Sequence, residues 1–433
     1  MPGTSMRRAI SLVGGTALLA AALGSVTTAQ SDAPVTLTYS TFVNDPNPQI
    51  AQALADAYTA LHPNVTIDVV TRPGGAEGDN LVKTALATDE MEDVFMYNAG
   101  SLLQALSPTE QLVDLSAEPC IPNIAESFIP AVTQGAGIFG VPVEPAMGGG
   151  ILYNKKVYEQ LSLAVPTTWA EFGANNEAIK AAGIAPVGAT YGDTWTSQLF
   201  VLADYYNVQS AIPDFADDYT GNKIKYATTP AALAGFQHLQ EGFDKGWYQK
   251  DFGSAKFDDG LNMLAAGEIA HYPMLTFALA AIAANNPDKI NDIGFFAQPG
   301  DDATKNGATV WMPAALYIPQ SSTNIDVAKD FLCFVASVAG TEAMQAAVPP
   351  SGPYLIKGST LPADALPAVL DLQKYLDTNM AAPALEFVSP VKGPSLEQIT
   401  VEVGSGLRSA EDGAALYDQD IEKQAKQLGL PGW

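Results

Sequence analysis

The sequence GIFGVPVEPAMGGGILYNKKVY, residues 137–158, decides more about the fold than any other stretch of this 433-residue chain. It holds Pro142 and Pro145, and proline is disfavoured inside helices and central strands because it lacks a backbone N–H. Three consecutive glycines at 148–150 then give the backbone a freedom that other residues lack. We therefore interpret the stretch as a flexible crossing between two lobes rather than as part of a core.

The first residues are typical of an export signal. Arg7 and Arg8 form a short basic region, residues 9–22 are apolar with many small side chains, and Ala29 ends a small-residue cleavage site. The arginine pair lacks the neighbours of a twin-arginine signal, and both cysteines lie too far away for a lipid at the new N-terminus. Residues 1–29 are thus predicted to be a signal peptide whose removal leaves a soluble periplasmic protein.

The chain is strongly acidic, with 47 Asp and Glu against 21 Lys and Arg and a formal net charge of −26 at pH 7. This charge repels nucleic acid and anionic lipid, and it argues against an anionic substrate unless a local basic patch exists. About 400 mature residues are enough for two domains with separate cores. Cys120 and Cys333 form either one disulfide or two buried thiols, because only the fold can bring them close enough to bond.

The first hundred residues after the signal alternate between strand and helix patterns. Strands are expected at 35–39, 65–69 and 94–97, and helices at 50–61 and 81–86. Such a βαβαβ unit implies a mostly parallel sheet with helices on both faces. Because ligands gather beyond the carboxyl ends of these strands, we expect the loops at 40–47 and 97–101 to face a ligand.

The chain beyond the crossing has mainly helical patterns. Thr168 and Glu171 have the spacing of a capping box, which predicts a helix that runs to about Ala182. A strand-like piece follows at 183–187, and the pattern then favours helices until about Asn286. Strands are expected again at 290–296 and 309–318, followed by a buried helix at 327–335 and a helical C-terminal region.

An ordered series of motifs resembles one known family. The segments are YNKK at 153–156, VPTTWAEF at 165–172, DVFMYNAGSLLQAL at 93–106, LAAGEIAHYPMLTF at 264–277 and VAKDFLCFVAS at 327–337. Together they resemble the bacterial extracellular solute-binding proteins of the maltose-binding type, which are sugar-capturing receptors of ABC importers. The resemblance covers most of residues 35–340 and is vague beyond about Pro350.

The resemblance implies a two-lobed α/β periplasmic-binding-protein fold, in which each lobe is a mostly parallel sheet flanked by helices and a hinge joins the lobes. In this family the chain crosses between lobes more than once. By analogy, the first lobe is expected at 30–143 and 298–350, and the second lobe at 144–297 and 351–433. The expected partners of the monomeric receptor are a small carbohydrate and the permease subunits of an ABC transporter.

Motifs for catalysis, metals and cofactors are missing from the sequence. The three histidines lie far apart, and there is no HExxH, phosphate loop, strand-linked GxGxxG or GxSxG. The acid pairs at 217–218, 258–259 and 301–302 sit beside glycines or turn formers, which is typical of solvated turns. We therefore expect no catalytic residue, no metal site and no cofactor.

A carbohydrate site needs aromatic side chains that pack on the C–H faces of a sugar and polar side chains that satisfy its hydroxyls. We choose candidates from segments expected to face the cleft. The first lobe contributes Phe42, Asn44, Tyr97, Asn98 and Gly100, the crossing contributes Glu144 and Met147, and the second lobe contributes Trp195, Tyr272 and Phe277. Trp311, Tyr354 and Phe387 are further candidates.

Each main candidate has a plainer alternative. Glu144, between two prolines on the expected cleft floor, either accepts two hydroxyl protons of one sugar ring or is an exposed hinge acid. Tyr97 is alternatively a buried strand aromatic, and Asn98 with Gly100 a helix cap and turn. Trp195 and Trp311 are alternatively core residues.

The sequence thus favours a receptor that binds a neutral mono- or oligosaccharide by hinge closure and delivers it to an ABC importer. A receptor for another small solute, such as a polyol or a glycerophosphodiester, is the nearest alternative. An anionic ligand would require an arginine in the cleft, and none lies in the favoured loops. An exported carbohydrate-active enzyme and a purely structural exported protein are the alternatives from other classes.

Overall fold

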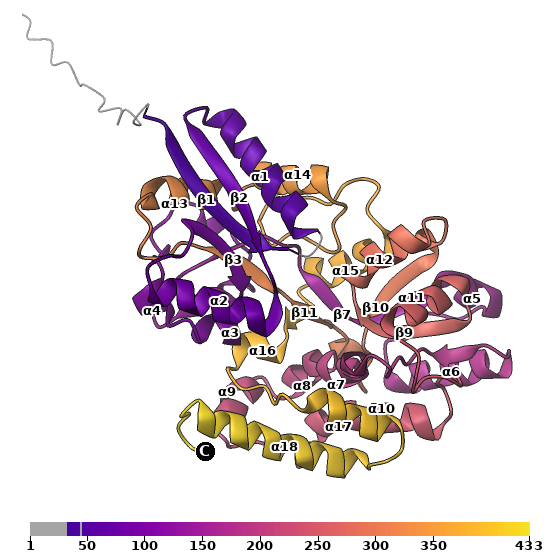
Figure 1. Cartoon of the computed structure of the whole chain (residues 1–433). Helices are drawn as coiled ribbons and strands as arrows, with labels where there is room; N and C mark the ends of the chain where they lie inside the picture. The colour runs from indigo at the N-terminus through magenta and orange to yellow at the C-terminus, as the bar shows by residue number, and fades with distance from the viewer. Residues whose placement is uncertain (1–32, 44–45) are drawn as a thin grey trace, which may run out of the picture.

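The computed structural model describes residues 33–43 and 46–433, which form two lobes, each built on its own β-sheet (Figure 1). The predicted signal peptide and the candidate Asn44 lie outside the described residues. Within the described residues, no helix is both long and apolar enough to cross a membrane. The two-lobed α/β architecture is the one that the sequence predicts.

The first lobe is built on a five-stranded sheet. Its order is β2 (Val65–Arg72), β1 (Val35–Phe42), β3 (Val94–Asn98), β12 (Ala314–Tyr317) and β6 (Val141–Pro142). β1 is parallel to β2 and β3, as the βαβαβ pattern predicts, whereas β12 is antiparallel to β3 and β6. Pro142 lies in β6, an edge strand, which is the position where a sheet tolerates proline.

The carboxylate of Asp93, just before β3, joins the start of β3 to β1. It accepts hydrogen bonds from the backbone N–H of Thr38 in β1 at 3.0 Å and from the Thr38 hydroxyl at 3.1 Å. Its other oxygen accepts from the Ser322 hydroxyl at 2.7 Å and the Asn324 side-chain amide at 3.2 Å. One side chain therefore ties β1, the start of β3 and the segment after β12 together.

Helices cover the first sheet and connect its strands (Figure 1). On α1, Ile50, Leu54 and Tyr58 recur at four-residue spacing and are buried, so this helix packs its apolar stripe on the lobe core. The helical segments of this lobe are α1 (Asn47–Leu61), α2 (Gly75–Ala87), α3 (Ser101–Gln104), α4 (Pro108–Gln111), η1 (Ile121–Asn123), η2 (Ile129–Val132), α13 (Ile325–Val335) and α14 (Val338–Ala347), and β4 (Thr133–Gln134) pairs with β5 (Gly137–Ile138).

The second lobe is built on a mixed sheet. Its order is β13 (Ala381–Pro383), β11 (Ala308–Trp311), β7 (Met147–Asn154), β9 (Ile269–Leu275) and β8 (Ala185–Val187), and β10 (Ile293–Ala297) also pairs with β7. β7 is antiparallel to β9, β10 and β11. The sheet therefore differs from the expected mostly parallel arrangement. The chain enters the lobe along β7 and leaves it along β11, so these two neighbours must run in opposite directions.

Most of the second lobe is helical. The capping box predicted at Thr168 and Glu171 is confirmed, and it opens α6 (Trp169–Ala181). The other helical segments are α5 (Lys155–Leu161), η3 (Thr194–Gln198), α7 (Leu199–Leu202), α8 (Tyr205–Ala211), α9 (Phe215–Thr220), α10 (Pro230–Asp244), α11 (Phe257–Ala266), α12 (Ala278–Asn285), η4 (Ile290–Asp292), η5 (Ala303–Lys305), α15 (Pro367–Asp377), α16 (Leu385–Val388), α17 (Leu396–Gly404) and α18 (Ala410–Gln427).

Strand β9 is a strand that the sequence pattern missed, since it interrupts the stretch expected to stay helical until about Asn286. It is buried and pairs with β7 on one side and β8 on the other. Pro273 argues against a central strand in the sequence. In the structure the pairing with β8 reaches only His271, so Pro273 lies beyond it and pairs with Ile151 of β7 alone.

The glycines at 148–150 are not a flexible connector, contrary to the sequence-based interpretation. They lie inside β7, where Gly149 pairs with Leu275 of β9 and Thr309 of β11. A Cβ atom at Gly149 would lie 2.1 Å from the Trp311 ring, and one at Gly150 would lie 2.5 Å from the Phe296 carbonyl oxygen. Positions 149 and 150 require glycine, because the Trp311 ring and the Phe296 carbonyl occupy the space that a side chain would need.

Three segments connect the lobes within residues 46–433. The first is 143–146, between β6 and β7, and the second is Met312 and Pro313, between β11 and β12. The third lies between Ile356, which bridges to Ile124 of the first lobe, and α15, which packs on β10. Because β11 pairs with β7, residues 308–311 belong to the second sheet, and the return to the first lobe follows them instead of starting near Gln298.

Cys120 and Cys333 are joined by a disulfide, with their Cα atoms 5.2 Å apart. Cys333 lies in α13 and Cys120 in the segment between α4 and η1, so both ends belong to the first lobe. The bond spans a sequence separation of 213 residues, which includes most of the second lobe. It therefore joins the two sequence portions of a discontinuous lobe.

The substitution Gly149→Ala should destabilise the protein by about 1–3 kcal/mol, because the added methyl group overpacks the contact with Trp311. Chemical denaturation measures the loss. Gly253→Ala is the matched control, since no atom lies within 4 Å of the added Cβ there. Equal stability of the two variants would contradict the close packing of β7.

Removal of the disulfide in the double variant Cys120→Ala, Cys333→Ala should lower the free energy of unfolding by about 2–4 kcal/mol, because the unfolded chain loses a long-range constraint. A reducing agent should lower the melting temperature of the parent protein and leave that of the variant unchanged. A parent protein whose two thiols titrate freely before reduction would show that the bond does not form.

Candidate functional site

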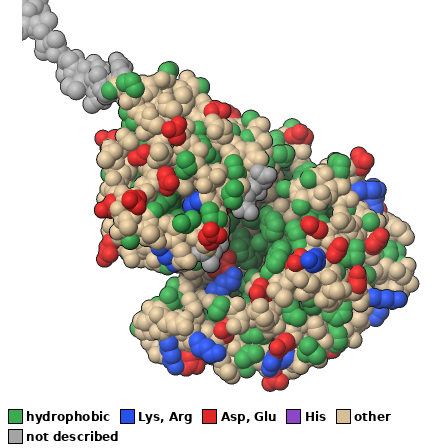
Figure 2. Space-filling view, viewed as in Figure 1, with side chains coloured by type: hydrophobic (Ala, Val, Ile, Leu, Met, Phe, Trp, Pro, Cys, Tyr) green, Lys and Arg blue, Asp and Glu red, His purple; other side chains and the backbone are tan. Residues whose placement is uncertain are grey.

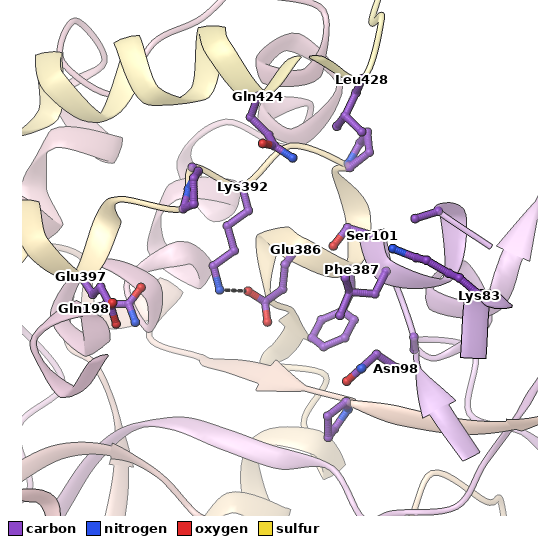
Figure 3. Close-up of a pocket in the computed structure, with 17 residues that line it drawn as sticks. Lys83, Asn98, Ser101, Gln198, Glu386, Phe387, Lys392, Glu397, Gln424 and Leu428 are labelled. Carbon is purple, nitrogen blue, oxygen red and sulfur yellow. Dashed lines mark hydrogen bonds and ion pairs between the residues drawn. The ribbon is translucent and has the colours of Figure 1, made fainter. Parts of the chain in front are cut away.

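The two lobes face each other across a cleft, which Figure 2 shows as a hollow with hydrophobic side chains in its depth. Part of the space between the lobes is a cavity of about 670 Å³ (Figure 3). Lys83, Asn98 and Ser101 of the first lobe line it, and so does Pro313 of the second crossing. From the second lobe it is lined by Gln198, Glu386, Lys392 and Glu397, among others. We call this space the interlobe cavity.

The wall from the first lobe begins where β3 ends. Asn98 is the last residue of β3, and its half-buried side chain faces the interlobe cavity (Figure 3). Gly100 has φ +68°, a backbone conformation that favours glycine, and its N–H donates to the Ala131 carbonyl at 2.7 Å. A Cβ atom at Gly100 would lie 2.7 Å from the Glu386 carbonyl oxygen, so the backbones of the two lobes touch here.

The wall from the second lobe is organised around the carboxylate of Glu386 in α16. It accepts a hydrogen bond from the indole N–H of Trp311 at 3.0 Å and forms an ion pair with Lys392 at 2.7 Å (Figure 3). The side chain of Glu386 remains 21 % exposed and that of Lys392 39 %. A fixed acceptor and a fixed donor are therefore both accessible from the interlobe cavity.

Gln198 and Glu397 extend this polar wall. Gln198 is the last residue of η3, and its side-chain amide donates to the Trp195 carbonyl at 3.1 Å. The Ser197 hydroxyl lies 3.0 Å from the Glu397 carbonyl and joins η3 to α17. The first hydrogen bond orients the Gln198 side chain relative to Trp195, and the second holds the backbone of α17 at Glu397 against η3.

Three half-buried aromatic side chains lie beside η3, and we call them the aromatic group. The ring of Trp195 lies 5.3 Å from that of Phe257 and 6.2 Å from that of Phe277, and the last two are 5.8 Å apart. The carboxylate of Asp193 accepts from the Phe257 N–H at 2.8 Å and holds α11 against η3. Aromatic rings that keep part of their surface open provide an apolar platform for a ligand.

Glu144 lies in the first crossing and is half-buried, so it is not an exposed hinge acid. Burial raises the pKa of its carboxyl from 4.5 to about 7. The buried ring of Tyr39 is close enough for the Glu144 charge to raise the pKa of the Tyr39 phenol, although burial is the larger cause. Met147, at the start of β7, is half-buried and pairs with Trp311.

Arg72, the last residue of β2, lies outside the favoured loops 40–47 and 97–101 but next to the first of them. Its guanidinium carbon lies 4.7 Å from the centroid of the half-buried Phe42 ring. The guanidinium donates to the Met96 carbonyl and, at 3.5 Å, to the Ser40 hydroxyl. It is 8 % exposed, and burial lowers its pKa. A buried cation thus lies at the carboxyl ends of the parallel strands, beside Phe42.

Four of the aromatic candidates, Tyr97, Tyr272, Trp311 and Phe387, are buried in the core. Tyr97 is fully buried in β3, and Tyr272 is buried with its hydroxyl 2.6 Å from the Thr190 hydroxyl. Trp311 is also buried, and its indole positions Glu386. The structure therefore leaves Tyr97 and Tyr272 without ligand-accessible surface, which the strand pattern alone could not decide because these strands are covered on both sides.

The remaining candidates fall into two places. Asn98 and Phe387 line the interlobe cavity, and Gly100 lines an adjoining cavity on the other side of Phe387. Phe42, Met147, Trp195, Phe277 and Tyr354 are half-buried and pack against the larger apolar core without lining the interlobe cavity.

Sequence reasoning missed Glu386, Lys392, Gln198, Glu397 and Phe257. Glu386 directly precedes the chosen Phe387, and Gln198 lies one turn after the chosen Trp195, so both could have been found by widening those choices. Lys392, Glu397 and Phe257 belong to no recognisable motif. Among the described residues, no cluster of three or more His, Cys, Asp or Glu side chains could hold a metal ion.

Two lobes that enclose a polar and aromatic cleft, joined by short crossings, define a two-lobed ligand-binding protein. Residues 44–342 match the model of the family described as bacterial extracellular solute-binding protein, and the chain belongs to that family. Its sequence is 24 % identical over 360 residues to the multiple sugar-binding protein of Streptococcus mutans, an alignment that covers 81 % of this chain and 82 % of that protein.

Solved structures of similar proteins share the fold. The apo form of RafE from Streptococcus pneumoniae superposes with a TM-score of 0.77 at 19 % identity, over 92 % of this chain and 98 % of that one. A chitin oligosaccharide binding protein gives a TM-score of 0.72 at 21 % identity, over 91 % and 99 % of the two chains. The two-lobed α/β prediction is thereby confirmed.

The substitution Glu144→Gln should raise the melting temperature of the ligand-free protein at pH 8. The folded protein binds this proton more tightly than the unfolded chain does, so ionisation destabilises the fold as the pH rises from about 4.5 through about 7. The gain should disappear near pH 4, where the carboxyl is protonated in both states.

The matched control for this substitution is Glu126→Gln, because the side chain of Glu126 is 92 % exposed. Melting curves of the parent and both variants at pH 4, 6 and 8 make the comparison. A Glu144→Gln variant that melts with the parent at pH 8 would contradict the burial of this carboxyl.

Proposed function

We propose that this protein is the substrate-binding protein of an ABC transporter, which captures a neutral mono- or oligosaccharide and delivers it to the membrane permease. The observation that carries the proposal is the cleft between the lobes, where half-buried aromatic rings lie beside fixed polar side chains. Similar proteins named for multiple sugars and chitin oligosaccharide, and others solved in complex with raffinose and stachyose, support a carbohydrate ligand.

The chemistry of the cleft suits a sugar. The aromatic group of Trp195, Phe257 and Phe277 offers apolar surface to the C–H face of a ring. Glu386 accepts hydroxyl protons, and Lys392 donates to hydroxyl oxygens through charge-assisted hydrogen bonds. Glu144 adds a further acceptor from the crossing between the lobes. Donors, acceptors and rings together match the mixed surface of a carbohydrate.

The mechanism is closure of the two lobes around the ligand. Short crossings, such as the two residues between β11 and β12, connect the lobes and let them rotate as bodies. A ligand shifts this equilibrium only if it binds the closed state better than the open one. A sugar that contacts Asn98 in the first lobe and Glu386 in the second meets that requirement, because separation of the lobes breaks one set of contacts.

The same proposal covers the cellular context. The protein acts as a monomer in the periplasm after removal of residues 1–29, and its partners are the permease subunits. It binds its ligand without turnover, because its sequence motifs indicate neither a catalytic triad nor a pair of carboxylates placed for hydrolysis. The first lobe then corresponds to residues 30–142 and 314–356. The second lobe corresponds to residues 147–311 and to the chain from the start of α15 at Pro367 onward.

Arg72 favours one second candidate, a receptor for a glycerophosphodiester. Its buried guanidinium, at the carboxyl ends of the strands in the first sheet, would neutralise the negative charge of a phosphodiester. A cleft without a cation could not do so. The strong overall negative charge of the chain opposes this ligand.

A thermal-shift screen of the mature protein tests the proposal. The panel contains galactose, melibiose, raffinose, stachyose, xylo-oligosaccharides and chito-oligosaccharides, with sorbitol, glycerophosphocholine, amino acids and divalent metals as other classes. A ligand that binds only the native state raises the melting temperature, so hits should be confined to carbohydrates. Hits only from glycerophosphocholine would support the second candidate, and hits only from amino acids or metals would overturn both.

Trp195→Ala and Glu144→Ala should each weaken binding of the best carbohydrate by at least about tenfold, or roughly 1.4 kcal/mol, measured by isothermal titration calorimetry. Trp433→Ala is the matched control, since the Trp433 indole donates to the Thr220 carbonyl at the C-terminal end of the chain and lies outside the cleft residues. Unchanged affinity in both cleft variants would place the ligand elsewhere.

A further inference from the structure

One short helical turn faces two different parts of the space between the lobes. Trp195 and Gln198 both belong to η3, and the Gln198 amide donates to the Trp195 carbonyl at 3.1 Å. Trp195 belongs to the aromatic group, whereas Gln198 lines the interlobe cavity. The aromatic group and the interlobe cavity are therefore neighbours that share η3 as a common wall.

The interlobe cavity is large enough to hold part of a ligand by itself. Its volume of about 670 Å³ lies within the range of small-molecule pockets, about 300–1,000 Å³. Neither Trp195 nor Phe257 nor Phe277 lines it. A single sugar ring placed on the aromatic group would therefore leave the cavity to solvent.

The polar groups of the cavity come from both lobes and balance in charge. Lys83 of the first lobe and Lys392 of the second are matched by Glu386 and Glu397, while Asn98 and Gln198 add neutral amides (Figure 3). The Glu386 carboxylate is fixed by Trp311 and Lys392, so it keeps its position without a ligand. Fixed donors and acceptors in a charge-balanced cavity suit the hydroxyl rim of a neutral ring.

We infer that the ligand is a linear oligosaccharide, in which one ring packs on the aromatic group and the next rings extend past η3 into the interlobe cavity. This inference rests on the proposed function and narrows its substrate class from sugars in general to chains of two or more rings. Gln198 lies at the junction, and the Glu386–Lys392 pair contacts the extending rings.

The dependence of affinity on chain length tests this inference. Calorimetry on the intact protein compares members of three series: galactose, melibiose, raffinose and stachyose; xylose to xylotetraose; and N-acetylglucosamine to its tetramer. In the series that binds, the dissociation constant should fall at least about 100-fold from the monosaccharide to the trisaccharide.

Variants of the cavity should reduce this gain. Glu386→Gln and Gln198→Ala should each weaken trisaccharide binding at least about tenfold more than monosaccharide binding, whereas Trp195→Ala should weaken both to a similar extent. Glu402→Gln is the matched control, because Glu402 forms a comparable ion pair with Arg408 at 2.6 Å outside the cleft. The ratio of the two affinities cancels any change in the folded fraction.

The outcomes separate this inference from the proposed function. A monosaccharide that binds as tightly as its trisaccharide would overturn the inference and leave the sugar receptor intact. Equal losses for short and long chains in the Glu386→Gln and Gln198→Ala variants would also overturn it. Absence of binding by every carbohydrate would overturn the proposed function itself.

Discussion

The close packing of the Trp311 ring on Gly149 is the contact on which the second lobe and its site depend. A Cβ atom at Gly149 would lie 2.1 Å from that ring, so only glycine lets the Trp311 ring of β11 pack this closely on β7. Held there, the Trp311 indole donates to Glu386, and Glu386 in turn pairs with Lys392. The need for glycine at position 149 thereby helps to fix the Glu386 carboxylate that faces the cleft, although the two residues lie far apart in the sequence.

The connections between the lobes follow from how the chain enters and leaves the second lobe. It enters along β7 and leaves along β11, so these neighbouring strands are antiparallel. The first residue of β7, Met147, therefore pairs with the last residue of β11, Trp311, beside the crossings. The two residues Met312 and Pro313 then carry the chain back to β12 of the first lobe. The Ala146 N–H donates to the Pro353 carbonyl at 2.7 Å, which holds the first crossing against the segment that leads to the third.

Each lobe supplies only part of the site, and burial gives its groups their properties. The first lobe contributes the end of β3 at Asn98, and the backbone at Gly100 touches α16 of the second lobe. Glu144 is half-buried between the lobes, which raises the pKa of its carboxyl to about 7. Ionisation of this half-buried carboxyl lowers the stability of the folded protein. A ligand hydroxyl that donates a hydrogen bond to the carboxylate offsets that loss.

Elements whose signals are local could be predicted from the sequence. The alternating pattern at 35–39 and the capping box of Thr168 and Glu171 are each settled by backbone chemistry within a few residues. The series of family motifs predicted two lobes and a cleft between them. The motifs also led to Phe277 as a candidate, and the structure places it in the aromatic group with Trp195.

Features that depend on residues far apart in the sequence could not be predicted from it. The pairing of Cys120 with Cys333, the location of glycines 148–150 inside a central strand, and β9 with its proline all follow from contacts between distant segments. Glu386 becomes a site residue because Trp311, 75 positions earlier, donates to it. In the sequence, Tyr97 and Tyr272 cannot be told from exposed aromatic residues. In the structure they are buried because their strands are covered on both faces. Burial is a property of the packed sheet, and no local pattern encodes it.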